Sequence, residues 1–317
     1  MTRALKVTGK VLLIILGIVI ALLLVIFVYH RIMLAKEESL IEEPIGQMVE
    51  VDGKKMCVYS SGSGEHTLLF LSGSGTASPI LDFKSLYSQF EDQRIVVIEK
   101  FGYGYSDISG DDRSFDTILR QDREALSKVG ITGPYVLCPH SMSGLEAILW
   151  AQNYPDEVEA IVGLDMCVPR SYDSYDVKAT VRYEMLGAFA RETGIIRFFY
   201  TDSMLPEGLS KQEKKIYKAI AAKKAVNADI MSESKAIEDA VKEIDSKPVP
   251  DVPMLMFSSD GKETGLDNWI GLQKDYAKGL KNAELIELDC GHYVHNHEPE
   301  RISREIVAFL GGLSDKK

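Results

Sequence analysis

Two different hydrophobic patterns divide the chain into a short N-terminal segment and a long remainder. Residues 11–29 form a run without any charged side chain, VLLIILGIVIALLLVIFVY. As a helix with a rise of 1.5 Å per residue, this run reaches roughly 28 Å, close to the roughly 30 Å of a bilayer core. The remainder shows short apolar runs that alternate with stretches of helical spacing. The pattern predicts a membrane span followed by a globular α/β body.

The alternation in the body predicts a parallel sheet with helices on both faces. A hairpin is expected first, over residues 46–59, with its turn at Asp52-Gly53. Further strands are expected at residues 67–71, 95–98, 135–138, 160–164, 253–257 and 283–288. Helices are expected near residues 85–90, at 115–129, at 145–151 and from Pro299. Side chains at the carboxyl ends of these strands should gather at one edge of the sheet.

Residues 168–252 interrupt the alternation. They show helical patterning at residues 177–192, 195–200, 211–226 and 230–244, without a convincing strand. One interpretation is a lid that shapes a substrate pocket. The alternative, more common for any single residue, is that the apolar side chains pack the segment's own core. The candidate wall residues are Tyr183, Phe198, Phe199, Tyr200 and Met204.

The stretch Pro139-His140-Ser141-Met142-Ser143-Gly144 carries the strongest chemical signal. It joins an expected strand to an expected helix, and this arrangement is typical of a nucleophile elbow with Ser141 at the turn. The elbow strains the serine backbone and needs small neighbours two positions before and after it. Ser143 is small, whereas Pro139 departs from the usual glycine. An ordinary strand-to-helix turn that contains serines is the alternative.

Other landmarks accompany this serine in chain order. A glycine-rich loop at residues 72–75 follows one strand, and Gly291-His292 follows the last. This set resembles the α/β-hydrolase superfamily over roughly residues 48–312. Two departures are Ser72-Gly73, where His-Gly is usual, and Phe101, where arginine is usual.

The resemblance implies an α/β-hydrolase fold: a mostly parallel, doubly wound sheet with an inserted helical cap, preceded here by one N-terminal transmembrane helix. The core would comprise residues 48–167 and 253–312, and the cap residues 168–252. Ser141 would be the nucleophile and His292 the base, with the N–H groups of Met142 and Ser74 as the oxyanion hole. No metal or cofactor is expected. A serine at the elbow would exclude the haloalkane dehalogenase and epoxide hydrolase branches, which use aspartate.

The acid of the triad remains open among three candidates. In the superfamily it usually lies in the loop after the strand at residues 253–257, and Glu263 and Asp260 flank the expected position. Glu263 is favoured and Asp260 comes second. Asp165, at the end of the preceding strand, is third, because some members take the acid from there. Each has an ordinary structural alternative as a turn or helix-capping residue.

Charge and composition narrow the partners. The net charge is −11, although residues 1–36 carry basic side chains and no acidic one. An acidic body argues against nucleic acid as a partner. The resemblance to the hydrolases implies a small-molecule or lipid-like substrate instead. The four cysteines show no CxxC spacing and are interpreted as buried thiols, although a disulfide between Cys138 and Cys167 stays open. His292, His295 and His297 lack partners for a metal site.

The apolar run is interpreted as an uncleaved anchor, residues 1–36, because it exceeds the roughly 7 to 15 residues of a signal peptide's apolar region. Residues 37–47 would be a polar stalk. The basic residues before the run favour a cytoplasmic N-terminus and an extracytoplasmic body.

The sequence therefore predicts a single-pass membrane serine hydrolase that acts on an ester, thioester or amide carbonyl. The alternative is a membrane-tethered binding or sensor protein that keeps the scaffold with little turnover. The departures at Pro139, Ser72 and Phe101 keep this alternative open.

Overall fold

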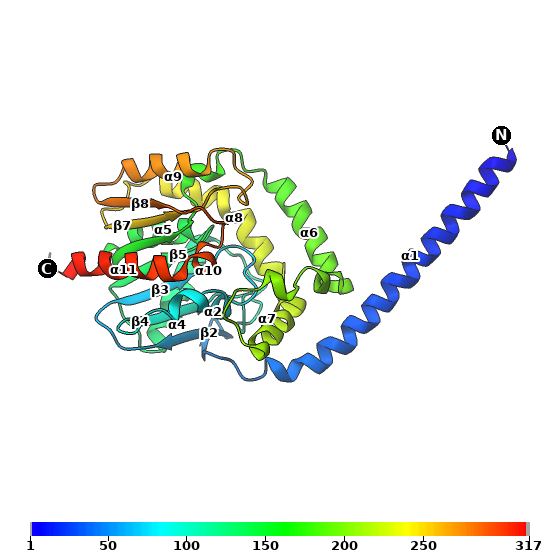
Figure 1. The fold of residues 1–317 in the computed structure, drawn as a ribbon, viewed down its shortest axis with the longest axis horizontal. Coiled ribbons are helices and arrows are strands. Elements are labelled where there is room, and N and C mark those ends of the chain that lie inside the picture. The colour runs from blue at the N-terminus through cyan, green and yellow to red at the C-terminus, as the bar shows by residue number, and fades with distance from the viewer. Residues whose placement is uncertain (1, 315–317) are drawn as a thin grey trace.

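A computed structural model describes residues 2–314 and contains one eight-stranded sheet (Figure 1). The strand order is β1-β2-β4-β3-β5-β6-β7-β8. β2 runs antiparallel to β1 and β4, and all other neighbours are parallel. The strands are β1 (Gln47–Val51), β2 (Lys54–Ser61), β3 (Thr67–Leu71), β4 (Arg94–Glu99), β5 (Tyr135–Pro139), β6 (Val158–Leu164), β7 (Met254–Ser258) and β8 (Ala283–Glu287).

The predicted strands form because their residue patterns suit their places in the sheet. β3, β5 and β7 are buried at every position, as expected for near-continuous apolar runs covered on both faces. The β1–β2 hairpin turns at Asp52 and Gly53, which have φ of 51° and 74°. Positive φ at both turn positions matches the right-handed twist of the strands.

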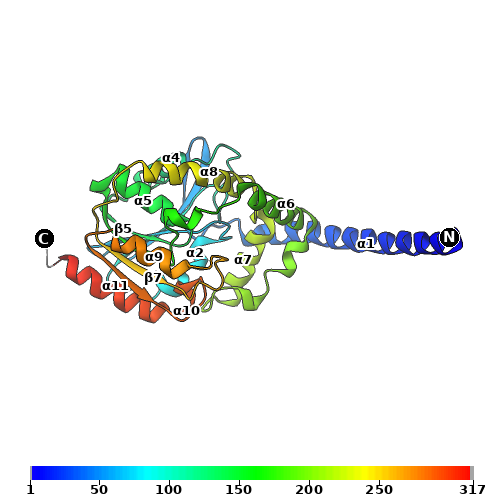
Figure 2. The same ribbon diagram turned by 90° about the horizontal axis from the view of Figure 1, so that it is seen from above.

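Helices cover both faces of the sheet (Figure 2). One face packs against α4 and α5, and the other against α3 and α11. Ser114 begins α4 by accepting a hydrogen bond from the Thr117 N–H. The helices of the core are α2 (Pro79–Asp82), α3 (Lys84–Tyr87), α4 (Phe115–Lys128), α5 (Ser143–Asn153), η2 (Pro155–Glu157), α9 (Trp269–Lys278), α10 (Val294–His297) and α11 (Pro299–Ser314).

Residues 168–252, which we call the cap segment, contain helices and no strand. Figures 1 and 2 place α6 and α7 at the end of the body from which the N-terminal helix extends. The segment comprises η3 (Pro169–Tyr172), α6 (Val177–Thr193), η4 (Ile195–Phe198), η5 (Asp202–Met204), α7 (Lys211–Lys224) and α8 (Ala228–Asp245). α8 packs on α4 and α5 of the core, and α7 and α6 pack on the N-terminal helix.

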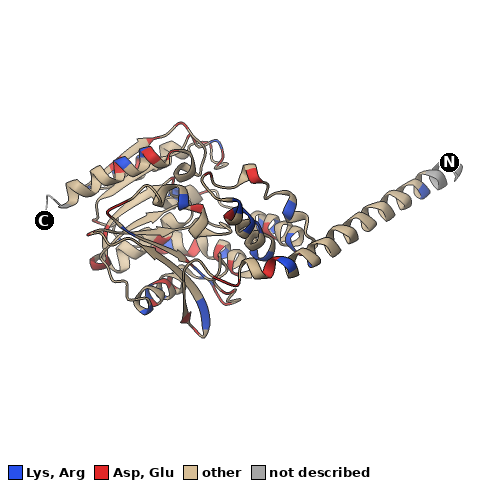
Figure 3. Cartoon of the chain, turned by 60° about the horizontal axis from the view of Figure 1, so that its bottom comes forward, with Lys and Arg blue, Asp and Glu red and all other residues tan. Residues whose placement is uncertain are grey.

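The N-terminal helix, α1 (Thr2–Glu37), is long and apolar enough to cross a membrane. Its apolar part carries neither blue nor red in Figure 3. The end of α1 contacts α6 and α7 of the cap segment. η1 (Glu38–Leu40) follows at once and contacts α7, where Lys223 pairs with Glu38 at 3.1 Å.

Most of the apolar side chains considered as pocket walls or as cap core are exposed to solvent. Tyr183, Phe198, Phe199 and Met204 are exposed to solvent, and only Tyr200 is half-buried, next to the ring of Tyr217. The interpretation that they pack the segment's own core is therefore wrong for the four exposed residues, whereas the interpretation as pocket walls stays a prediction.

Candidate active site

Ser141 lies on a strained turn between β5 and α5. Its φ is 54°, a left-handed conformation that costs free energy in a residue with a side chain. The turn is held by the Ser141 carbonyl, which accepts hydrogen bonds from the N–H groups of Gly144 at 3.0 Å and Cys167 at 2.8 Å. A Cβ at Gly144 would lie 2.1 Å from the Cys167 carbonyl oxygen, so this position requires glycine. The backbone geometry of a nucleophile elbow is therefore present despite Pro139.

The expected base, His292, contacts the carboxylate of Asp165. His292 Nδ1 lies 2.6 Å from Asp165 Oδ2. Asp165 follows β6 and is fully buried, whereas His292 follows β8 and is partly exposed. Residues 127 positions apart in the chain meet because both strands end at the same edge of the sheet.

The second oxygen of Asp165 is held by three donors. Oδ1 accepts hydrogen bonds from the Ser259 N–H at 2.7 Å, Trp269 Nε1 at 2.6 Å and Gln273 Nε2 at 3.3 Å. With the His292 ring on Oδ2, the buried carboxylate is fully satisfied, as an ionised group in an apolar setting must be. These contacts fix both the position of Asp165 and the orientation of the His292 ring.

The expectation that Glu263 or Asp260 is the partner of the His292 ring was wrong. Glu263 is exposed, and its Oε2 accepts the backbone N–H of His292 at 2.9 Å rather than a ring proton. Asp260 binds the N–H of Lys262 at 3.0 Å and its ammonium at 2.6 Å. Spacing along the loop could not separate these roles, because the loop turns Glu263 towards the backbone of its neighbour.

His140 joins the elbow to the His292 loop. Its ring centroid lies 4.7 Å from that of His292, and its Nε2 lies 3.2 Å from the His292 carbonyl oxygen. Because a carbonyl only accepts, Nε2 carries the proton. Burial, and then the neighbouring His292 and His295, hold the pKa of His140 well below its usual value. His140, the residue before Ser141, is therefore neutral and packs against His292.

The two N–H groups expected to form an oxyanion hole are available. Within residues 2–314, neither the Met142 N–H nor the Ser74 N–H donates a hydrogen bond. The loops that carry them are in contact, because a Cβ at Gly73 would lie 2.8 Å from Ser141 Cβ. Glycine at position 73 thus lets this loop approach the elbow closely.

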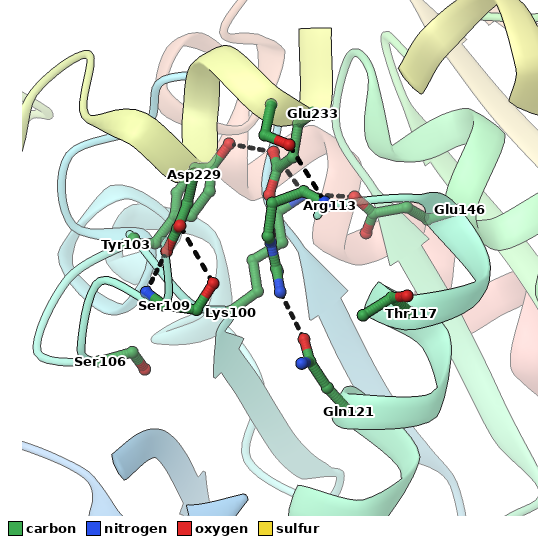
Figure 4. Close-up of polar contacts among 12 residues, drawn as sticks. Lys100, Tyr103, Ser106, Ser109, Arg113, Thr117, Gln121, Glu146, Asp229 and Glu233 are labelled. Atoms are coloured by element: carbon green, nitrogen blue, oxygen red, sulfur yellow. Dashed lines mark hydrogen bonds and ion pairs between the residues drawn. The ribbon is translucent and has the colours of Figure 1, made fainter. Parts of the chain in front are cut away.

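A buried polar network links this loop to the cap segment (Figure 4). Tyr103 Oη accepts the Gly75 N–H at 3.3 Å and donates to Glu233 Oε2 of α8 at 2.6 Å. Lys100 pairs with Glu233 at 3.4 Å and with Glu146 of α5. All four side chains are buried. The network joins the loop at residues 72–75, the helix α5 and α8.

Asp165 could be found from the sequence as a carboxylate at a strand end, whereas nothing in the sequence points to its partners Trp269 and Gln273. Tyr103 could not be found either, because a tyrosine in a loop carries no recognisable spacing.

Among residues 2–314, no group of histidine, cysteine, aspartate and glutamate side chains could hold a metal ion. His295 instead binds Asp82 at 2.9 Å, and His297 is exposed. The four cysteines are free thiols, so Cys138 and Cys167 are not bonded to each other.

Comparison with known proteins gives one relative over nearly the whole chain. The chain is 37% identical over 297 residues to the uncharacterized protein YbdG of Bacillus subtilis, which covers 90% of this chain and 91% of that protein. It is 26% identical over 201 residues to an abhydrolase domain-containing protein of Schizosaccharomyces pombe, covering 58% of this chain and 68% of that protein. No family model matches the chain.

Solved structures share the fold. A loop variant of the haloalkane dehalogenase DbeA from Bradyrhizobium elkanii is 18% identical, with a TM-score of 0.65 over 85% of this chain and 97% of that chain. A mutant of a Pseudomonas aeruginosa protein assigned to the epoxide hydrolases is also 18% identical, with a TM-score of 0.64 over 85% and 96%. At such identities the likeness concerns the fold alone.

Proposed function

The chain has the fold of the α/β-hydrolase superfamily, and from that premise we propose that it is a serine hydrolase of this superfamily. Its substrate would be a carboxylic ester, thioester or amide. Ser141 would be the nucleophile, His292 the base and Asp165 the acid. The observation that supports this most directly is the 2.6 Å contact between His292 Nδ1 and Asp165 Oδ2, beside an elbow whose serine has a φ of 54°.

The proposed reaction uses these groups in two stages. His292 Nε2 takes the proton of Ser141 Oγ, and the oxygen attacks the substrate carbonyl to form a tetrahedral intermediate. The N–H groups of Met142 and Ser74 bind the developing oxyanion. The intermediate collapses to an acyl-enzyme as His292 gives its proton to the leaving group. Water, activated by His292, then releases the acid and restores Ser141.

In this cycle, Asp165 would set the tautomer of His292 and stabilise its charged form. Its negative charge keeps the proton of neutral His292 on Nδ1, so that Nε2 is free to accept, and stabilises the imidazolium that forms. The fold neighbours include haloalkane dehalogenases, but the elbow of this chain carries serine. We therefore propose acyl transfer to serine rather than the chemistry in the names of these neighbours.

Labelling by a fluorophosphonate tests the proposal. The full chain in detergent is the suitable sample, because truncation before residue 37 would remove His30, which is buried against the cap segment. The full chain should label and hydrolyse short-chain aryl esters, and Ser141→Ala should abolish both activities. His292→Ala should also do so, whereas His297→Ala, at an exposed histidine in the helix α10 that follows, should leave both unchanged.

A folded wild-type chain that neither labels nor hydrolyses any aryl ester would contradict the enzyme proposal. That result would favour the tethered binding or sensor protein.

We further propose that α1 is a retained anchor with the body on the outer face. Besides its length and composition, its end is built into the body: Glu37 pairs with Arg197 of η4 at 2.7 Å. The mature protein should keep Met1 or Thr2 as its N-terminus, and external protease should degrade the body on intact cells. A mature N-terminus near Lys36 would instead show cleavage of a signal peptide.

A further inference from the structure

We propose that the exposed apolar surface of the cap segment docks on the lipid bilayer that α1 crosses. This surface, which we call the cap apolar surface, comprises Tyr183, Met185, Leu186, Phe189, Phe198, Phe199 and Met204. The inference rests on the proposal that α1 spans the membrane, and it is independent of the catalytic activity.

The cap apolar surface is unusual for a protein surface in water. Outside α1, twelve large apolar side chains of the described residues are exposed, and seven of them lie between Tyr183 and Met204. Tyr183 is 75% exposed, Met204 71% and Phe198 66%. Single exposed apolar residues need no explanation, but a cluster of this kind marks an interaction site.

α6 lacks the buried face that normally stabilises a helix. None of its residues is buried, although it extends over Val177–Thr193. Helices in proteins owe most of their stability to the packing of an apolar face. On α6, Met185, Leu186 and Phe189 lie at helical spacing and are exposed. The partner of this face is therefore absent from the body itself.

The contact between α1 and the cap segment places this surface at the bilayer. The apolar run ends at Tyr29, and the next residue, His30, is buried at 2% exposure. His30 packs over Gly194, where an added Cβ would lie 2.4 Å from His30 Cβ. Arg197 Nε donates to His30 Nδ1 at 3.0 Å and pairs with Glu37 at 2.7 Å.

Phe198 and Phe199 directly follow Arg197 in the chain. Their exposed side chains therefore lie close to the point where α1 would enter the membrane. Figures 1 and 2 agree that the cap segment forms the end of the body from which α1 extends. Aromatic side chains are favoured at the level of the lipid headgroups. Arg182 and Lys178, exposed on the same helix, provide the cations that suit a helix lying at an anionic interface. A lipid surface therefore fits this site better than a protein partner.

Quenching by brominated lipids tests the docking. Full-length Phe198→Trp and Phe189→Trp variants are reconstituted into phosphatidylcholine–phosphatidylglycerol vesicles with or without bromine on the acyl chains. The native Trp150 and Trp269 are buried in the body, and the unsubstituted chain gives their background. We expect bromine to lower the added emission of both variants about two-fold or more, because their side chains enter the interface.

Two control variants separate the possible failures. Val249→Trp replaces an exposed apolar residue that precedes β7, at the amino ends of the parallel strands. This tryptophan should not be quenched. Leu16→Trp lies within the apolar run and should be quenched if α1 spans the bilayer.

Quenching of Leu16→Trp without quenching at Phe198 and Phe189 would overturn the docking while leaving the span intact. A cross-linked dimer under the same conditions would then assign the cap apolar surface to a second copy of the chain. Absence of quenching at Leu16 would refute the span, and the docking with it.

Discussion

Replacing Asp165 by asparagine should almost abolish turnover while leaving the fold intact. The amide oxygen is held on the side of Ser259, Trp269 and Gln273, because all three donate hydrogen bonds to Oδ1. The amide nitrogen must then face His292 Nδ1, which in the native chain lies 2.6 Å from Oδ2. Two donors cannot face each other, so Nδ1 gives up its proton and accepts from the amide.

The proton of His292 consequently moves to Nε2, the atom that must accept the proton of Ser141. In the serine-protease triad, the same replacement lowers kcat about 10⁴-fold, which corresponds to roughly 5 kcal/mol of activation free energy. The contacts of Asp165 are equivalent in kind, so a loss of about this size is expected for Asp165→Asn.

Aryl-ester hydrolysis and the rate of fluorophosphonate labelling measure this loss, and circular dichroism checks the fold. Glu263→Gln and Asp260→Asn are the matched controls, since neither side chain contacts the ring of His292. Both should change kcat less than about 10-fold. Near wild-type turnover in Asp165→Asn, or a severe loss only in Glu263→Gln, would refute the assignment of the acid.

Three further predictions concern the buried groups around the site. Tyr103→Phe removes the hydroxyl that accepts the Gly75 N–H, and should lower kcat roughly 10- to 100-fold with little change in KM by loosening the loop at residues 72–75; an unchanged kcat would contradict this. Lys100→Met leaves the carboxylate of Glu146 buried without its cation, whereas Glu233 keeps its pairing with Arg113 at 3.7 Å; the free energy of unfolding should fall by about 3–5 kcal/mol in urea denaturation. Burial raises the pKa of Glu99 from 4.5 to about 7, so the folded state keeps a proton that the unfolded state releases. Stability should therefore fall by on the order of 3 kcal/mol as pH rises between these two values, and Glu99→Gln should flatten the profile; equal slopes would refute the role of Glu99.

The residues of the candidate site differ in how far the sequence could predict them. Ser141 could be found because the elbow is local: a strand, a turn and a helix adjacent in the chain determine its geometry. His292 could be found from its place after the last strand. The acid could not be fixed, because Asp165, Asp260 and Glu263 all follow strands whose carboxyl ends meet. Only the direction in which each carboxylate points, towards the ring of His292 or away from it, distinguishes the three residues.

The sequence by itself determined the order of strands and helices, the long apolar helix at the N-terminus and the interruption by the cap segment, because these depend on periodicity and length. Tertiary structure decided the contacts between distant segments. It turned Glu263 towards the backbone of His292 and brought Asp165 to its ring. It also left Phe198 exposed beside the end of α1, although packing in the cap segment's own core was one of the two interpretations of this residue. An apolar residue in a sequence indicates only that it avoids water, whereas the surrounding fold decides whether protein or another phase covers it.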